Sequence, residues 1–240
     1  MKTKLFSLCF VLLASMSGCA NDATTGDKGS TNDQKAELLC PAPANVQAVD
    51  LGLPSGVKWA SCNVGAMNPE DYGNYYAWGE VLPKMDYSWE TYKYANYANG
   101  DGITKYCSDA SYGVKDNKKT LTPNDDAAHV NWGGKWRMPT LAEWEELYND
   151  KYCRMIVTTQ NGIEGVLIKS RINGNSIFLP YAGLRKSSHL DYDEASGFYW
   201  SSSLYGNKSS SAWHFYFSQD FSDKTYSTRI RGFSIRPVCK

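Results

Sequence analysis

The chain has 240 residues, and its 25 basic and 25 acidic side chains give a formal net charge of zero at neutral pH. A chain without net charge gives no reason to expect a nucleic-acid partner or electrostatic binding to a membrane surface. The length is enough for one large domain or two small ones, and the 17 tyrosines, 8 tryptophans and 8 phenylalanines indicate a core of large rings.

The N-terminus has the pattern of a bacterial lipoprotein signal. Two lysines precede an apolar run over residues 5–14, which is too short to cross a bilayer as a helix. Small residues directly before Cys19 resemble a lipobox, which implies that residues 1–18 are removed and that Cys19 is acylated, for example with palmitate. Ala20 after the cysteine favours the outer membrane. We therefore expect an exported outer-membrane lipoprotein, facing either the periplasm or the cell surface, that contacts the membrane through its lipid anchor.

Residues 19–44 are predicted to be a flexible tether. Polar and small residues dominate up to Gln34, and the segment 40–44 contains two prolines. Such a composition cannot bury a core and remains extended. Residues 45–240 form the predicted domain, which the tether would hold away from the membrane.

The first part of this domain begins with a hairpin. Residues 48–53 and 57–64 read as its strands, and Pro54-Ser55-Gly56 reads as its turn. From Glu80 to Trp132 no regular period appears, although tyrosines and tryptophans recur. We interpret this stretch as a long loop region that is fixed by its aromatic side chains.

A helix is predicted to begin at Thr140. Thr140 and Glu143 have the spacing of a capping box. In such a box the side chain of each residue accepts a hydrogen bond from the backbone N–H of the other. One apolar stripe follows at helical spacing. It consists of Leu141, Trp144, Leu147 and Tyr148.

Strand patterns follow this helix. Residues 163–172 and 176–184 form a predicted second hairpin around Asn173-Gly174. Further strands are predicted at 198–202, 212–217 and 232–238. One principal helix together with antiparallel hairpins and long loops indicates an α+β domain.

Several ordered sequence blocks point to a known family. These blocks are residues 49–53, 58–66, 72–80, 125–128, 132–140, 178–183, 199–203 and 232–239. Together they resemble the Fibrobacter succinogenes major paralogous domain, a group related to C-type lectin-like folds, over about residues 49–239. The resemblance implies a C-type lectin-like domain whose first and last strands meet and whose late strands carry a ligand face. It implies little about activity, because the family consists mainly of exported proteins of unassigned function.

Five cysteines remain after Cys19, so at least one stays free or pairs between chains. The implied fold brings the two terminal strands together, and Cys62 and Cys239 lie on them. A Cys62–Cys239 disulfide is therefore the first choice, with Cys40 as a competing partner for Cys239.

The sequence offers little support for catalysis. Its three histidines lack metal-ligand spacing, and no Cys-x-x-Cys pair, nucleophile elbow, phosphate loop or dinucleotide fingerprint occurs. Acidic pairs such as Asp125-Asp126 and Glu145-Glu146 fit a turn and a helix. We expect a protein that is not an enzyme and that uses no cofactor and no catalytic metal. A carboxylate-dependent hydrolase and a structural calcium ion at residues 116–126 remain weaker alternatives.

The predicted ligand face lies in residues 204–231, which are rich in Ser, Tyr, Asn, Asp and Lys. Strand alternation from Ala212 directs Trp213, Phe215 and Phe217 to the core and His214, Tyr216 and Ser218 to the ligand face. The predicted ligand-binding residues are Tyr205, Asn207, His214, Tyr216, Asp220, Asp223 and Tyr226.

The ligand expected for this face is a surface glycan or a protein. The segment is compatible with the C-terminal part of C-type lectin-like proteins that diversity-generating retroelements vary. A structural or fimbria-associated surface component is the alternative function.

Overall fold

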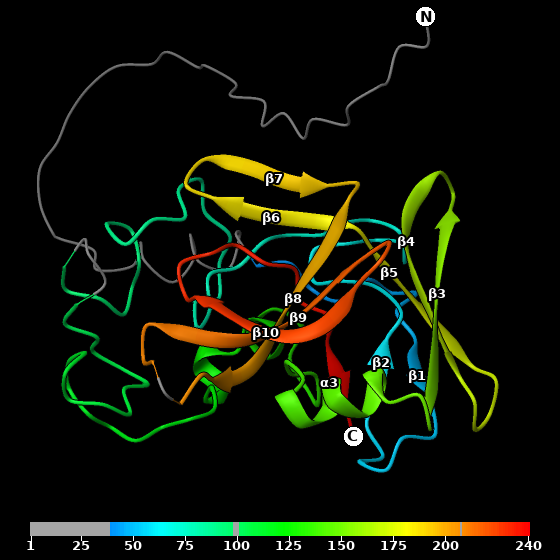
Figure 1. The fold of residues 1–240 in the computed structure, drawn as a ribbon, viewed down its shortest axis with the longest axis horizontal. Coiled ribbons are helices and arrows are strands. Elements are labelled where there is room, and N and C mark those ends of the chain that lie inside the picture. The colour runs from blue at the N-terminus through cyan, green and yellow to red at the C-terminus, as the bar shows by residue number, and fades with distance from the viewer. Residues whose placement is uncertain (1–38, 98–100, 207) are drawn as a thin grey trace, which may run out of the picture. The chain divides into compact units, whose positions relative to one another are not determined.

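Strands make up most of the regular structure in the computed structural model, which describes residues 39–97, 101–206 and 208–240 (Figure 1). A five-stranded sheet has the order β10-β9-β8-β6-β7, in which β6 and β8 are parallel and the other pairs antiparallel. Its strands are β6 (Ala182–Lys186), β7 (His189–Asp193), β8 (Ser196–Leu204), β9 (Ser211–Ser218) and β10 (Ser222–Thr228).

Two three-stranded antiparallel sheets complete the architecture. One has the order β3-β4-β5 and the other the order β1-β2-β11, so the last strand pairs with the second. Their strands are β1 (Ala48–Asp50), β2 (Lys58–Ala60), β3 (Cys153–Gln160), β4 (Ile163–Ser170), β5 (Ser176–Pro180) and β11 (Val238–Cys239).

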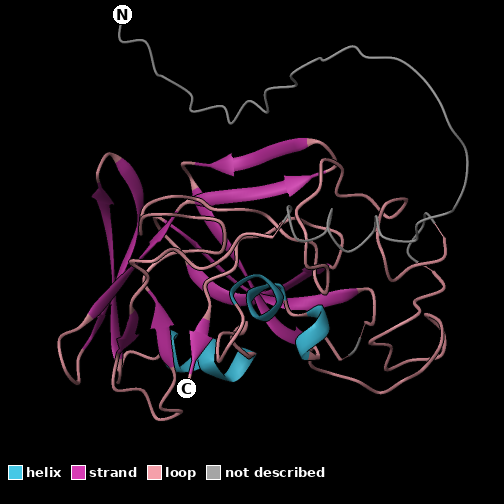
Figure 2. Ribbon diagram, turned by 180° about the vertical axis from the view of Figure 1, so that it is seen from behind, coloured by secondary structure: helices cyan, strands magenta, loops and turns pink. Residues whose placement is uncertain are grey.

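The helical elements are short (Figure 2). They are η1 (Pro123–Asp125), α2 (Ala127–Trp132) and α3 (Leu141–Tyr148). The predicted capping box is confirmed in α3, since the Thr140 side chain accepts from the Glu143 N–H and the Glu143 carboxylate accepts from the Thr140 N–H. In the described part of the chain, no helix is long and apolar enough to cross a membrane.

The expected α+β class, a C-type lectin-like domain built around one principal helix, is wrong. From β3 to β10 the chain forms strands in close succession, and three of them, β3, β7 and β10, were not expected. The eight-residue α3 covers only part of this β structure. The predicted strand 232–238 contributes only its last residue to β11, because its backbone N–H groups bond in turn to the separate residues Arg185, Tyr76 and Phe198.

The hydrophobic core joins α3 to the sheets. Trp144 of α3 stacks on Phe215 of β9 with ring centroids 5.2 Å apart, and it also contacts Trp59 of β2 at 4.7 Å. All three side chains are buried. Burial of rings this large stabilises the fold by several kcal/mol for each ring, about 25 cal/mol per Å² of apolar area. This packing also fixes the position of α3 over β9, which is the basis of the site described below.

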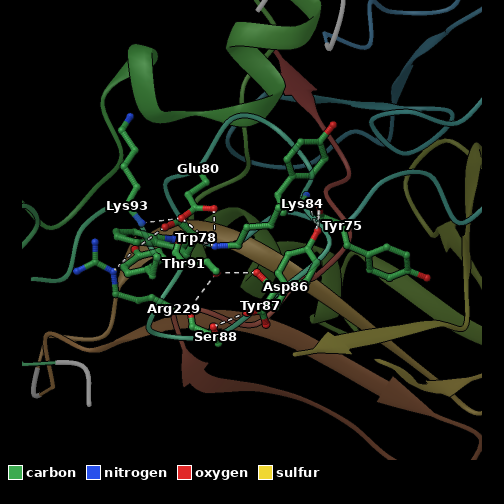
Figure 3. Close-up of polar contacts among 12 residues, drawn as sticks. Tyr75, Trp78, Glu80, Lys84, Asp86, Tyr87, Ser88, Thr91, Lys93 and Arg229 are labelled. Atoms are coloured by element: carbon green, nitrogen blue, oxygen red, sulfur yellow. Dashed lines mark hydrogen bonds and ion pairs between the residues drawn. The ribbon is translucent and has the colours of Figure 1, made fainter. Parts of the chain in front are cut away.

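The described residues between Ala60 and Pro123 form no helix or strand, only isolated bridges. Arg229 organises part of this region from inside (Figure 3). Its buried guanidinium donates to the Tyr92 hydroxyl at 2.7 Å and lies 4.8 Å from the Trp78 ring centroid. Nearby, Glu80 accepts hydrogen bonds from the Lys93 N–H and the Lys84 ammonium. Buried aromatic rings and these polar contacts therefore hold the backbone where no sheet ladder does.

Candidate ligand-binding groove

A cavity of about 710 Å³ opens between α3, the start of β3 and β10, and we name it the α3 groove. Its volume lies in the range of about 300–1,000 Å³ that is usual for sites that bind small ligands. Its lining combines aromatic, acidic and basic side chains. The lining residues are Trp144, Glu145, Tyr148, Asn149, Asp150, Arg154, Met155, Arg171, Phe215, Ser222, Asp223 and Lys224.

The floor of the groove is aromatic and rigid. The rings of Trp144 and Phe215 are nearly parallel, at 11°, and the indole N–H of Trp144 donates to the carbonyl of Trp200 at 3.3 Å. Tyr148, one helical turn after Trp144, lies 5.8 Å from Phe215 and remains 44% exposed. The apolar stripe of α3 thus ends in a ring that a ligand can reach. The sequence predicted the stripe but not its use as a binding surface.

The rim of the groove carries charges of both signs in equal number. Lys224 forms an ion pair with Glu145, and Arg171 lies 3.8 Å from Asp150. Arg154 and Asp223 add one more charge of each sign. The groove therefore has many hydrogen-bonding groups and no net charge, which suits a neutral polar ligand better than a polyanion.

A second, smaller cavity of about 170 Å³ continues the groove and shares Met155 and Ser222 with it. Val157 and Val166 line it from the β3-β4 hairpin, and Phe221 lines it from the turn between β9 and β10. The combined cavity thus follows the first half of β10.

The structure brings only some of the seven predicted ligand-binding residues together. Asp223 lines the α3 groove, and Asp220 lines the smaller cavity. Tyr205 and Tyr226 stack on each other with centroids 3.9 Å apart and ring planes 8° apart. Asn207 lies outside the described residues, as does Cys19.

The expected exposure of His214 is wrong. Its side chain is buried, with its ring 4.7 Å from Phe233 and 5.8 Å from Trp200, and its Nδ1 has no hydrogen-bond partner among the described residues. Burial lowers the pKa of His214 to about 3, so the ring is neutral. Tyr216 projects to the same side of β9 and is half-buried against Phe198 at 5.0 Å.

His214 is buried because both faces of the five-stranded sheet are covered. The alternation along β9 is present, but neither face is open to solvent along its whole length. Trp213, assigned to the core, is only partly buried, and Tyr226 opposite it is exposed. The accessible aromatic residues therefore lie on the face that was expected to be the core face.

The predicted Cys62–Cys239 disulfide is also wrong, because both cysteines are free thiols. Cys239 lies opposite Lys58 in the β2-β11 register. Cys62 lies four residues after Lys58, which is roughly 13 Å of extended chain. A disulfide needs two Cα atoms within about 7 Å of each other. Cys40, the competing partner, is free as well, and its sulfur accepts from the Asn74 side-chain amide at 2.9 Å.

The described residues contain no cluster of metal-binding side chains. Among the described residues, no group of three His, Cys, Asp or Glu side chains is arranged to hold an ion. Asp125, one of the weaker calcium candidates, instead bonds to Lys105, Tyr94 and Tyr106. Burial acts to raise its pKa, but these hydrogen bonds outweigh that effect and lower it to about 2.

Comparison with protein families gives one match. A family model described as a domain of unknown function (DUF8237) matches residues 166–238, the stretch from β4 to the first residue of β11. That stretch contributes Arg171, Phe215 and the β10 residues to the groove. Comparisons with curated proteins and with solved structures find no match.

Proposed function

We propose that this protein is an exported, lipid-anchored binding module that captures a neutral glycan in the α3 groove. The observation that carries the proposal is the solvent-accessible ring of Tyr148 beside a rigid Trp144–Phe215 floor, surrounded by balanced polar groups. The C–H faces of sugar rings stack on aromatic side chains, while their hydroxyls bond to charged and amide groups. A site with both features suits such a ligand.

Binding is favoured over carboxylate-dependent hydrolysis by the surroundings of the groove acids. A general acid at neutral pH needs burial that raises its pKa. The Glu145 side chain is 43% exposed and paired with Lys224, and the Asp150 side chain is 95% exposed. These carboxylates are placed to accept hydrogen bonds from a ligand.

The first test concerns Tyr148. We expect Tyr148→Ala to weaken binding of the full-length protein to neutral glycans about tenfold, because the stacking ring is lost. An array of neutral and sulfated glycans measures this. Tyr97→Ala, which removes an even more exposed ring from the loop before Gly102, is the control and should bind normally. Unchanged binding by Tyr148→Ala, or capture of sulfated glycans alone, would contradict the assignment.

The second test concerns the anchor. We expect Cys19→Ala to abolish incorporation of labelled palmitate and to remove the processed protein from the membrane fraction. Cys40→Ala is the control, since it changes a cysteine in the same N-terminal region and should leave labelling intact. A Cys19→Ala protein that still takes up label would show that the lipobox assignment is incorrect.

A further inference from the structure

Three aromatic side chains form a second accessible surface, which we name the tyrosine platform: Tyr205, Trp213 and Tyr226. Tyr205 and Tyr226 are stacked, and the Trp213 ring meets them edge-on at 4.9 Å and 6.2 Å. Tyr226 is 47% exposed, while Tyr205 and Trp213 are half-buried. Rings held rigidly in this way offer contact area at low entropic cost.

The register of β9 and β10 places the platform on the same side of the sheet as the α3 groove. Lys224 pairs with Phe215, and Tyr226 pairs with Trp213. Alternate residues of a strand share a face, and Phe215 and Lys224 both contact α3, through Trp144 and Glu145. Trp213 and Tyr226 therefore project toward the side on which α3 lies, about 7 Å along the strands from the Lys224–Glu145 ion pair.

The smaller cavity, the α3 groove and the platform thus follow one another along β10. Phe221 lines the smaller cavity, and residues 222–224 line the α3 groove. Tyr226 belongs to the tyrosine platform. From Ser222 to Tyr226 the strand covers roughly 14 Å. That length exceeds a single sugar ring.

We infer that the ligand is a linear neutral polysaccharide, with one part of the chain in the α3 groove and the next sugars stacked on the tyrosine platform. This inference rests on the proposed glycan-binding function and extends it to a polymer. The flat rings of a β-1,4-linked glucan present C–H faces on both sides, which match a groove with an aromatic floor and a stacked pair of tyrosines beyond it. The Lys224–Glu145 pair on the groove rim, two residues along β10 from Tyr226, supplies donors and acceptors to the sugar hydroxyls.

A peptide strand added to β10 is the competing occupant, because β10 is the edge of the five-stranded sheet. The composition of the edge opposes such pairing. Lys224, a charge near the middle of the strand, is held by Glu145, and charged residues on edge strands discourage the addition of further strands. The aromatic platform also offers stacking, which a backbone ladder does not use.

The test compares a short and a long probe on the full-length protein in detergent micelles. Cellobiose occupies the groove alone, and cellohexaose also reaches the platform. We expect cellohexaose to bind at least about tenfold more tightly than cellobiose by calorimetry. The double variant Tyr205→Ala with Tyr226→Ala should lose this gain and leave cellobiose affinity within about twofold. Tyr192→Ala, an exposed tyrosine on β7, is the control and should retain the gain.

The outcomes separate the two proposals. Equal affinity for both probes, or an undiminished gain in the double variant, overturns the platform and leaves groove binding in place. A wild-type protein that binds neither probe overturns glucan binding, and the inference with it. Hydrogen-exchange protection of the outward amides of Ser222–Thr228 by an extended peptide, with no protection by cellohexaose, would assign the edge to a peptide instead.

Discussion

Replacing Arg236 by methionine is expected to lower the free energy of unfolding by about 3–5 kcal/mol, a large share of the roughly 5–15 kcal/mol that holds a domain together. Arg236 is fully buried. Its Nε donates to Asn63 at 2.8 Å, its Nη1 to the carbonyls of Ala60 and Ser61, and its Nη2 to the carbonyl of Phe178 at 2.8 Å. One side chain therefore connects the end of β2, the C-terminal segment and β5.

The loss would be large because methionine fills the space but leaves several buried acceptors without donors. Burial lowers the pKa of Arg236, but an arginine guanidinium stays protonated in neutral solution. Lysine cannot replace it, since an ammonium has fewer donors and no planar fork. We expect Arg236→Lys to fall well below the wild-type protein in stability.

Urea unfolding followed by tryptophan fluorescence measures the effect. Arg154→Met provides the matched control, because Arg154 is exposed at the groove rim and should cost no more than about 0.5 kcal/mol. If Arg236→Met and Arg154→Met unfolded at the same urea concentration, the buried carbonyls would have found other donors and the bridging role would be incorrect.

Local signals in the sequence predicted local structure. The capping box at Thr140 and the apolar stripe predicted α3, because they satisfy the free N–H groups of the first turn and bury one face. Turn residues predicted the β1-β2 and β4-β5 hairpins, which the structure confirms. These elements depend on interactions between residues close in sequence.

The fold class depended on strands that carry weak sequence signals. β10 reads Ser-Asp-Lys-Thr-Tyr-Ser-Thr, without apolar alternation, because an edge strand needs little burial. The residues 232–238 look like a strand yet bond to several separate partners. Composition therefore underestimated the β content and overstated the role of one helix.

The site was harder to predict than the elements. The α3 groove joins Tyr148, Arg154 and Lys224, which come from α3, β3 and β10. No spacing rule brings these three together, because their proximity follows from the packing of Trp144 on Phe215. The alternation rule described β9 correctly but could not tell which face is covered, and this is why His214 was placed on a ligand face.

Acid should destabilise this protein through His214, and His214→Leu should remove that sensitivity. Burial lowers the pKa of His214 to about 3 in the folded protein, against about 6.5 in the unfolded chain. The unfolded state therefore binds the proton first. The stability from the neutral ring is fully present above pH 6.5 and is lost as the pH falls toward 3, at about 1.4 kcal/mol per pH unit. Between pH 6.5 and 4.5 the loss amounts to roughly 2–3 kcal/mol.

Urea midpoints at pH 7.5, 6.5, 5.5 and 4.5 measure this slope. The range ends at pH 4.5 because Asp125, whose pKa is lowered to about 2, contributes stability that is lost only at lower pH, as its carboxylate is protonated. His189→Leu is the matched control, since His189 is exposed at the start of β7 and should keep the wild-type slope. A His214→Leu protein that lost stability as steeply as the wild-type protein between pH 6.5 and 4.5 would show that His214 is not the group responsible.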